Sequence, residues 1–510
     1  MNETATASSV RWGSGAARGV LAATILGSGM AMLDSTVVNI ALPRIGAELD
    51  ASVSGLQWTL DGYLIALASL ILIAGALGDR FGRRKVFTVG VVWFGFASVL
   101  CGLAQTTEML VGARVLQGVG GALLTPGSLA ILQASFARED RARAIGAWSG
   151  MSGLAAAAGP VIGGLVVQAW SWRLAFLINV PLAFLCVWLT RRYVPESCDA
   201  LRGGRPDATS SALGALGLAG VTAALIEAPA RGAADPIVVV SGVLGVGALA
   251  AFVVMQRRSH DPLVAPALFR DRTFVLSNGL TLVVYAGLGG VLTLLILQLQ
   301  VSLDYTPTAA GLASLPITLL MLALSGRSGQ LAQRIGPRPQ LVVGPILIAG
   351  GMLLLLGVTP GSSYIGSVLP GVVVFGIGLV IVVAPVTSTV LAAAPDRYVG
   401  VASGVNNALA RTGTLLAIAV LPAIAGLTGD AYTDPAAMTR GFQIAIVVCA
   451  VLAAGGGLMG LGVAGNVLAV PAERVPEPGE AVTVEDAPQP GECLHCPVDG
   501  PPTHVRPARV

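Results

Sequence analysis

The feature that most constrains this chain is a succession of apolar runs, each about 20 residues long, separated by short clusters of charge. A helix rises 1.5 Å per residue, so about 20 residues cover the ~30 Å apolar core of a bilayer. Of the 510 residues, 54% are hydrophobic and only 11% are charged, whereas soluble proteins carry about 25% charge. The pattern predicts an all-α polytopic membrane protein.

Fourteen such runs can be counted, and each is predicted to be one transmembrane helix. Their approximate bounds are 19–43, 54–77, 86–104, 109–132, 144–168, 173–193, 211–230, 237–256, 273–300, 308–331, 340–358, 364–390, 399–426 and 441–465. Glu227 and Pro229 interrupt the end of the seventh run. The first run has no clear cleavage site, so we expect it to remain as a helix rather than be removed as a signal peptide.

The distribution of basic residues predicts the orientation of these helices. An even number of spans places both termini on one side. Alternate connections and the N-terminal segment hold about twenty basic residues, whereas the opposite connections hold only Arg44, Arg173, Arg231 and Arg440. The basic set is Arg11, Arg18, Arg80, Arg83, Arg84, Lys85, Arg138, Arg141, Arg143, Arg191, Arg192, Arg202, Arg205, Arg257, Arg258, Arg270, Arg272, Arg334, Arg338 and Arg397. Because positive loops stay in the cytoplasm, we expect a cell inner membrane protein with both termini cytoplasmic.

The remaining composition excludes several classes of function. A net charge of +3 gives no indication of a nucleic-acid partner. Residues 466–510 are rich in Pro, Glu and Gly and are predicted to be a disordered cytoplasmic tail. Cys493 and Cys496 with His495 and His504 are only a weak signal for a metal, because a second cysteine pair is missing. An unstructured, reduced tail is the favoured interpretation, and no metal site is predicted.

An internal repeat relates the two halves of the chain. Gly75, Leu77, Arg80, Gly82 and Arg84 match residues of the same type at a constant offset of 254, from Gly329 to Arg338. The same offset carries Arg143, Gly146, Gly150 and Gly159 onto Arg397, Gly400, Gly404 and Gly413. Parallel halves of this kind are a known transporter plan, with the substrate site between them near the midplane of the membrane.

The repeat predicts a domain organisation. After a cytoplasmic N-terminus at 1–18, residues 19–193 are expected to form an N-terminal six-helix bundle and residues 273–465 a C-terminal one. Residues 194–272 are expected to be a linker that contributes two extra transmembrane helices.

Four motifs carry a family resemblance over about residues 19–465. The segment GALGDRFGRRK at 75–85 resembles the signature between helices 2 and 3 of the major facilitator superfamily. LDSTVVNIALP at 33–43, RVLQGVGGALLTP at 114–126 and GPVIGG at 159–164 resemble motifs of its drug:proton antiporters. Together with fourteen runs they point to the fourteen-helix, multidrug efflux branch. The resemblance implies the major facilitator fold, with two six-helix bundles plus two inserted helices.

The motif between the second and third runs is expected to act as a conformational latch. It comprises Gly75, Asp79, Arg80, Gly82, Arg83 and Arg84. The resemblance implies that Asp79 holds the cytoplasmic side shut, while Lys85 is interpreted as a positive-inside anchor. In the second half Gln333 replaces the acid, so that latch should be weaker, because a neutral amide makes no charge-assisted bond.

Three charged residues fall inside apolar runs at overlapping depths, and we expect them to couple transport to protons. They are Asp34, Asp61 and Arg114. A lone charge in the bilayer costs at least ~2.5–3.5 kcal/mol, so each should face a partner or a wet cavity. Arg114 is permanently charged and can compensate one carboxylate, leaving the other marginal. We expect Asp34 to be the main proton carrier and Asp61 to sense charge or carry a second proton. A static salt bridge that pins helices is the alternative.

Two further residue sets are predicted from the motifs and from polar positions within the runs. The antiporter motif comprises Gly150, Gly159, Pro160, Gly163 and Gly164, where proline should kink the helix and the glycines allow close packing. The substrate cavity is expected to be lined by Asn39, Trp58, Tyr63, Gln117, Gln298, Asn406, Asn407 and Arg411. The absence of an acid near Asn406 argues against doubly charged cationic substrates and favours amphipathic ones that are singly charged or neutral.

Together these features predict a proton-coupled antiporter that exports amphipathic drugs, antibiotics or metabolites by alternating access. No ATP-binding loop, hydrolase motif or filter-like segment is present, so the chain is predicted not to be an enzyme, ATP-driven pump or channel. We expect no cofactor; the partners are protons, a small substrate and the bilayer, and a monomer suffices. A symporter or importer on the same fold, and a lipid-handling or scaffold membrane protein, remain the alternatives.

Overall fold

The computed structural model describes residues 10–197, 208–259, 262, 264–395, 398–427 and 434–468. These residues belong to one compact unit, Met1–Leu468. The predicted disordered tail, with Cys493 and Cys496, lies outside the described residues apart from 466–468.

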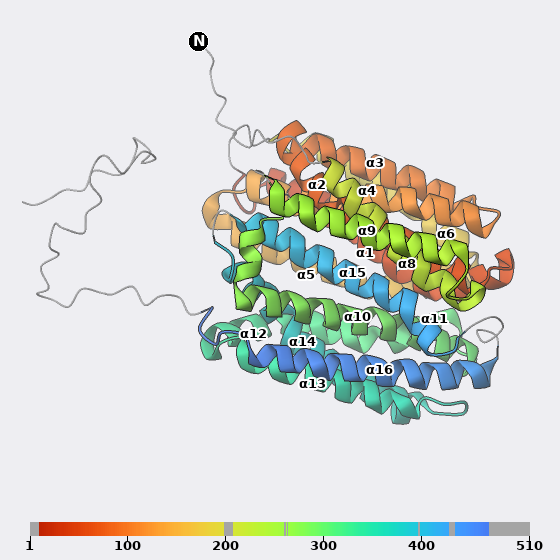
Figure 1. The fold of residues 1–510 in the computed structure, drawn as a ribbon. Helices are drawn as coiled ribbons and strands as arrows, with labels where there is room; N and C mark the ends of the chain where they lie inside the picture. Colours follow the sequence, from red (N-terminus) through yellow and green to blue (C-terminus); the bar gives the residue numbers. More distant parts are fainter. Residues whose placement is uncertain are drawn as a thin grey trace, which may run out of the picture. The chain divides into compact units, whose positions relative to one another are not determined.

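The described part of the chain is built from helices that run side by side (Figure 1). The α-helices are α1 (Gly15–Leu49), α2 (Val53–Phe81), α3 (Arg83–Gly102), α4 (Thr107–Ser135), α5 (Arg138–Ala169), α6 (Trp172–Leu177), α7 (Asn179–Tyr193), α8 (Ala208–Arg231), α9 (Pro236–Arg258), α10 (Arg272–Val301), α11 (Pro307–Ala313), α12 (Leu315–Ile335), α13 (Arg338–Leu354), α14 (Leu369–Ala392), α15 (Val399–Ile424) and α16 (Pro435–Leu461). Two short 3₁₀ helices are η1 (Pro266–Arg270) and η2 (Leu355–Gly357), and η3 (Tyr364–Val368) is a short π-helix.

Local sequence explains where these helices begin and turn. Ser52 and Thr106 cap α2 and α4, because each side-chain oxygen accepts a backbone N–H of the first turn. Gly82 alone separates α2 from α3 at φ 105°, a conformation that favours glycine. Gly336 ends α12 with φ 79°. Two positions of the repeat thus make the same kind of sharp turn.

Twelve helical segments in the described residues are long and apolar enough to cross a membrane. They match twelve of the fourteen predicted runs, and the all-α polytopic fold is confirmed. The other two runs correspond to α2 and α5, which have 29 and 32 residues and therefore also have the length to span a bilayer. A total of fourteen spans stays a prediction.

The helix pattern follows the repeat offset of 254 residues. Shifting α2 by this offset gives the segment Pro307–Ile335, which is the span formed by α11 and α12. Asn39 in α1 and Thr293 in α10 are also separated by 254 residues, and their side chains hydrogen-bond to each other at 3.3 Å. A residue in contact with its own counterpart lies close to the axis that relates the halves.

Helix packing shows which helices build each half and which helices join the halves. In the first half α1 packs on α5 and α7, and α4 packs on α2 and α3; in the second half α10 packs on α15 and α16, and α14 on α12 and α13. The halves meet where α2 contacts α15 and where α5 contacts α11 and α12. The hairpin α8–α9 packs through α8 on both α2 and α15, at one of these seams.

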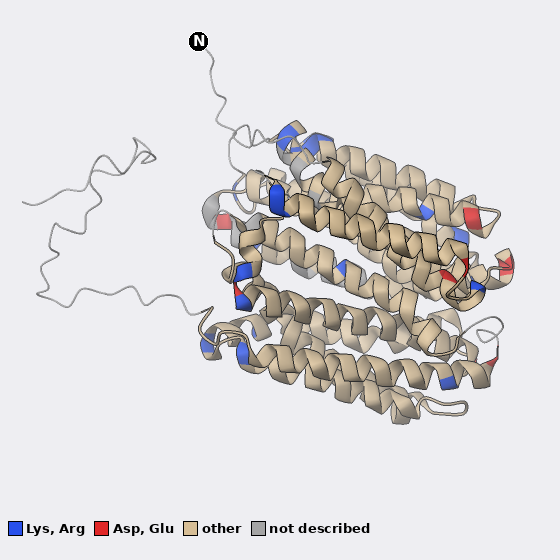
Figure 2. Cartoon of the chain, in the orientation of Figure 1, with Lys and Arg blue, Asp and Glu red and all other residues tan. Residues whose placement is uncertain are grey.

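The two ends of the helix bundle differ in charge. We call the end where α2 passes into α3 the α2–α3 end, and the opposite one, at the connection 50–52, the α1–α2 end. Figure 2 shows Lys and Arg gathered at the α2–α3 end, while most Asp and Glu lie at the α1–α2 end. The basic side chains there lie on several connections, as expected from the sequence.

Candidate functional site

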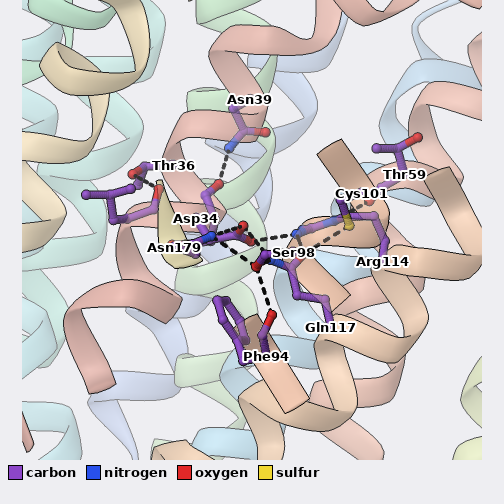
Figure 3. A network of polar contacts seen from close by, with 12 residues as sticks. Asp34, Thr36, Asn39, Thr59, Phe94, Ser98, Cys101, Arg114, Gln117 and Asn179 are labelled. Carbon is purple, nitrogen blue, oxygen red and sulfur yellow. Dashed lines mark hydrogen bonds and ion pairs between the residues drawn. The ribbon is translucent and has the colours of Figure 1, made fainter. Parts of the chain in front are cut away.

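The centre of the first half holds a buried ion pair between Asp34 in α1 and Arg114 in α4. Their side chains are 0% and 1% exposed, and Arg114 Nη1 lies 2.5 Å from Asp34 Oδ2. Figure 3 shows that the two side chains point toward each other across the helix interface. The sequence predicted that they lie at a common depth, and the structure shows that they are in contact.

Arg114 is satisfied by more than this carboxylate. Its Nε donates to the carbonyl oxygen of Thr59 at 3.0 Å, and Nη1 also donates to Gln117 Oε1 at 2.6 Å. The guanidinium carbon lies 4.3 Å from the centre of the Tyr63 ring, a distance at which a cation is attracted to the aromatic face. These contacts hold the arginine in one position between α2 and α4.

Three neutral side chains complete the network around Asp34. Gln117 Nε2 donates to Asp34 Oδ1 at 2.8 Å and to Ser98 Oγ at 2.9 Å. Asn179 Nδ2, from α7, donates to Asp34 Oδ1 at 3.2 Å. A carboxylate with these donors and an arginine is compensated in its charged form. The sequence did not predict Ser98 or Asn179, because neutral polar residues inside an apolar run carry no distinctive signal.

Asp61 in α2 is in a different environment. It is fully buried, and both of its carboxyl oxygens lack a hydrogen-bond partner. The structure therefore does not join it to Asp34 and Arg114, although the sequence predicted all three at similar depth. The carboxyl lies four residues along α2 from Gln57, so the two side chains share one face of the helix.

The predicted latch contacts the segment that follows α7. The backbone N–H of Arg84 donates to Glu196 Oε1 at 3.0 Å, and that of Arg83 donates to the carbonyl of Ser197 at 2.9 Å. A side chain at Gly82 would meet Glu196 within 2.6 Å. Arg80 is exposed and lies against the Phe81 ring. Gly75 is half-buried, and the side chain of Asp79 lies outside the described residues, so its role as a latch stays a prediction.

The predicted antiporter motif forms two close helix contacts. A Cβ on Gly159 or Gly163 would lie 2.0 Å and 2.8 Å from side chains of Thr36 and Val37 in α1. A Cβ on Gly164 would lie 2.6 Å from the Cα of Thr308 in α11. The motif therefore packs α5 against α1 on one side and against the other half on the other.

Pro160 and Gly150 are the other two members of the predicted antiporter motif. Pro160 is buried, and its carbonyl oxygen approaches Gly311 of α11, where a Cβ would be only 2.3 Å away. Gly150 lies in α5, and its surroundings are outside the described part of the structure.

The structure places the eight residues predicted to line one cavity in several different environments. Tyr63 and Gln117 belong to the Asp34 network, and Asn39 lies at the contact of α1 with α10. Trp58 Nε1 instead donates to Glu227 of α8 at 3.0 Å. Gln298 donates to Val358 and Thr439 within the second half, so it does not point to the first.

The three remaining predicted cavity residues lie in α15. Asn406 Nδ2 donates to Thr281 Oγ1 of α10 at 2.8 Å and to Asn278 Oδ1 at 3.2 Å. Asn407 is exposed and Arg411 is half-buried. Among the described residues no acidic side chain forms a salt bridge with Arg411, so this helix offers a cation rather than an anion to the interior.

The two buried carboxyls of the first half differ in their electrostatic surroundings. Within the described residues no group of three or more His, Cys, Asp or Glu is placed to hold a metal ion. What the arrangement offers is one carboxylate held beside a fixed cation and one buried carboxyl without a partner. Such a pair can hold a proton on one member while the other stays charged.

Comparison with known proteins shows which family this chain resembles. The sequence model described as "Major Facilitator Superfamily" matches residues 24–418. The chain is 34% identical over 416 residues to the multidrug resistance protein Stp of Mycobacterium tuberculosis, covering 81% of this chain and 77% of that one. It is 36% identical over 437 residues to the puromycin resistance protein pur8 of Streptomyces alboniger, covering 83% and 84%. The tetracenomycin C resistance and export protein of Streptomyces glaucescens is also 36% identical, over 422 residues that cover 81% and 77%.

Solved structures of transporters share the fold. A bacterial homologue of the human lysosomal transporter Spinster, in an inward-facing and occupied conformation, aligns with a TM-score of 0.64 at 18% identity, covering 90% of this chain and all of that chain. The peptide transporter PepTSo aligns with a TM-score of 0.64 at 16% identity, covering 87% and 96%. At these identities the likeness concerns the fold alone.

Proposed function

Because this chain belongs to the major facilitator superfamily, we propose that it is a proton-coupled antiporter that exports amphipathic drugs, antibiotics or metabolites. The observation that carries the proposal is the pair of buried carboxyls, Asp34 with a permanent cation beside it and Asp61 with no partner. Relatives named for antibiotic resistance and export favour efflux over uptake. The multi-pass helical architecture is that of a membrane transporter.

The proposed location is the cytoplasmic membrane, with both termini in the cytoplasm. The gathering of Lys and Arg at the α2–α3 end supports this orientation (Figure 2), since positive connections stay on the cytoplasmic side. The α1–α2 end then faces outward. Export moves substrate from the first end to the second while protons move in the opposite direction.

The structure favours a different division of labour between the two acids from the one that the sequence predicted. Asp34 is paired with Arg114 and accepts two amide hydrogen bonds, so its charged form is well supported. An ionised Asp61 would be an unpaired charge inside the protein, which is costly. We therefore propose that Asp61 carries the exchangeable proton in this conformation, while Asp34 stays ionised and holds Arg114.

The proposed substrates are bulky, mostly apolar molecules that are singly charged or neutral. Burial of Asp34 with Arg114 leaves no free fixed negative charge in that network. Asn406, Asn407 and Arg411 in α15 supply amides and a cation where divalent cationic drugs would need acids. Names of the relatives, which mention puromycin and tetracenomycin C, support antibiotics as the class to test first.

The proposal includes no cofactor, since the proton gradient drives transport. Protons, the small substrate and the lipid bilayer are the partners, and a monomer is adequate for a site between two halves of one chain. Neither nucleic acid nor metal has a role.

The deciding experiment uses inverted membrane vesicles that contain the protein and a fluorescent pH indicator in the lumen. Vesicles are first acidified inside, and then puromycin or another amphipathic antibiotic is added outside. An antiporter releases protons as it takes up drug, so the lumen should become more alkaline. Vesicles with the Asp61→Asn variant should show no such change.

The other candidate functions give different results in the same vesicles. A symporter would make the lumen more acidic as substrate enters, which would overturn the antiport proposal. Failure to move any drug, together with movement of a fluorescent phospholipid, would replace it with a lipid-handling role.

A further inference from the structure

Gln57 forms a polar bridge between the two halves where α2 meets α15. Its Nε2 donates to the carbonyl oxygen of Ile418 at 2.8 Å and to that of Ala419 at 3.1 Å. Pro422 lies four residues after Ile418 and has no N–H, so the helix itself leaves the Ile418 carbonyl without a donor. Gln57 supplies that missing donor from the other half, and its side chain is only 6% exposed.

The other hydrogen bonds between the halves lie on the same side of the molecule. Thr293 Oγ1 donates to Asn39 Oδ1, and Gln300 Nε2 donates to the carbonyl of Ile40, each at 3.3 Å. These residues are nearer the α1–α2 end than the α2–α3 end of α1 and α10. Within the described part of the chain, the side-chain hydrogen bonds between the halves therefore lie toward the α1–α2 end and hold it closed.

Gln57 also lines two cavities. On its outer side is a cavity of about 740 Å³ at the α1–α2 end, and on its inner side is a small one of about 20 Å³. Both are lined by Leu56, Gln57, Leu297 and Pro422. The inner cavity reaches Thr293, which is at the contact between α1 and α10. The two spaces lie in line along the seam between the halves.

The inserted hairpin forms part of the wall of the outer cavity. Ile226, Pro229 and Ala230 of α8 line it together with residues of α1, α2, α10 and α15. Trp58 of α2 holds α8 in this position, because its Nε1 donates to Glu227 Oε1 at 3.0 Å. Within α8, Arg231 Nε donates to the other carboxylate oxygen of Glu227 at 2.9 Å. A space of 740 Å³ lies within the size range of pockets for drug-sized molecules.

We infer that Gln57 is the lock of an exit gate between α2 and α15, and that the exported amphipathic molecule passes it into the outer cavity walled by α8. The inference rests on the proposed export function for the identity and direction of the passenger. When Gln57 loses its hydrogen bonds to Ile418 and Ala419, α2 and α15 can separate. The two cavities then join and open toward the centre of the helix bundle. Asp61 lies one turn further along the same face of α2, so the same opening brings water toward that carboxyl.

A cysteine reporter in the inner cavity tests the lock without any drug or gradient. Ala417 lines that cavity and is 7% exposed, so Ala417→Cys should react slowly with a membrane-impermeant maleimide added to intact cells. Adding Gln57→Leu, which cannot donate to the Ile418 carbonyl, should raise the labelling rate at least tenfold. The chain without the reporter gives the background.

Gln443→Leu is the matched control. Gln443 Nε2 donates to the carbonyl of Leu356 at 3.1 Å, an equivalent bond within one half, so its loss should leave the labelling rate unchanged. Pro422→Ala is a second test if Gln57→Leu does not fold. The alanine N–H competes for the Ile418 carbonyl, and labelling should again rise. An unchanged rate in correctly inserted Gln57 and Pro422 variants, or an equal rise in the control, would overturn the lock.

Chemical block of the outer cavity tests the route. Ala230→Cys, near the end of α8, modified with a bulky impermeant maleimide should slow antibiotic efflux at least fivefold. Modified Ala234→Cys, in the connection that follows α8 and away from the cavity, should not. Normal efflux after Ala230 modification would remove the cavity from the exit path. If no antibiotic is exported by the native chain while labelling responds to Gln57, the export function fails and the gate stands.

Discussion

At the scale of single residues, Asp34 and Arg114 depend on each other to be buried. Removing one partner leaves the other charge uncompensated, which costs about 3–5 kcal/mol for a buried pair. Asp34→Asn should therefore lower thermal stability in detergent by this order, and the double variant Asp34→Asn with Arg114→Gln should be destabilised less than Asp34→Asn alone. Thermal unfolding of the native chain, Asp34→Asn, Arg114→Gln and the double variant measures the coupling. Additive losses would contradict the pair's mutual dependence.

Asp61 should behave in the opposite way. Both of its oxygens lack partners, so Asp61→Asn removes no hydrogen bond and leaves a neutral side chain of almost the same shape. We expect its melting temperature to stay close to that of the native chain, while drug efflux driven by a pH gradient is lost. The opposite result would be a stable Asp34→Asn variant that no longer couples efflux to protons, together with an Asp61→Asn variant that still does. It would support the sequence-based prediction that Asp34 is the main proton carrier.

How much of the site can be read from sequence depends on the charge of each residue. Asp34 and Arg114 stand out because an ionised side chain in an apolar run demands a partner, and the structure brings them together. Gln57 carries no such signal. Pro422 reveals that the Ile418 carbonyl needs a donor, but which side chain supplies it depends on how two distant helices pack.

At the scale of helices, the contact between α5 and α11 depends on the absence of side chains. A Cβ at Gly164 would lie 2.6 Å from the Thr308 Cα, and backbone atoms cannot move aside as a flexible side chain can. Gly164→Ala should therefore push the halves apart and destabilise the protein by about 1–3 kcal/mol. Gly112→Ala is the control, because a Cβ added there would meet no atom of a neighbouring helix within 4 Å. Equal melting temperatures for both variants would contradict this packing argument.

Sequence predicts the presence of these helices better than their internal breaks. The run predicted at 173–193 is divided at Ile178 into α6 and α7, and the run at 308–331 is divided at Ser314 into α11 and α12. Hydropathy averages over a whole span, so a change of direction within it leaves no signal. Asn179, which reaches Asp34, begins α7 at one of these breaks.

At the scale of the whole molecule, the two halves share a backbone plan but differ in charge. Adding 254 to the residue number takes α2 onto α11 and α12. The same offset takes the three buried charged residues of the first half onto apolar residues. The counterparts of Asp34, Asp61 and Arg114 are Leu288, Leu315 and Val368. The repeat can be read from sequence because glycine turns and loop arginines persist in both halves. The proposed proton coupling therefore draws its three charged residues from the first half.

One switched carboxyl in one half implies a single proton exchanged in each transport cycle, and this fixes how transport responds to voltage. If Asp34 stays paired, one proton enters for each molecule exported. Export of a neutral drug then moves one net charge inward, worth about 2.3 kcal/mol per 100 mV. Export of a drug with one positive charge moves no net charge.

In proteoliposomes with a membrane potential but no pH gradient, a neutral antibiotic should therefore be transported and a monovalent cationic one should not, whereas a pH gradient should drive both. A potassium gradient with valinomycin sets the membrane potential. Voltage-driven transport of the monovalent cationic drug would show that two protons are exchanged in each cycle and that Asp34 also changes its charge.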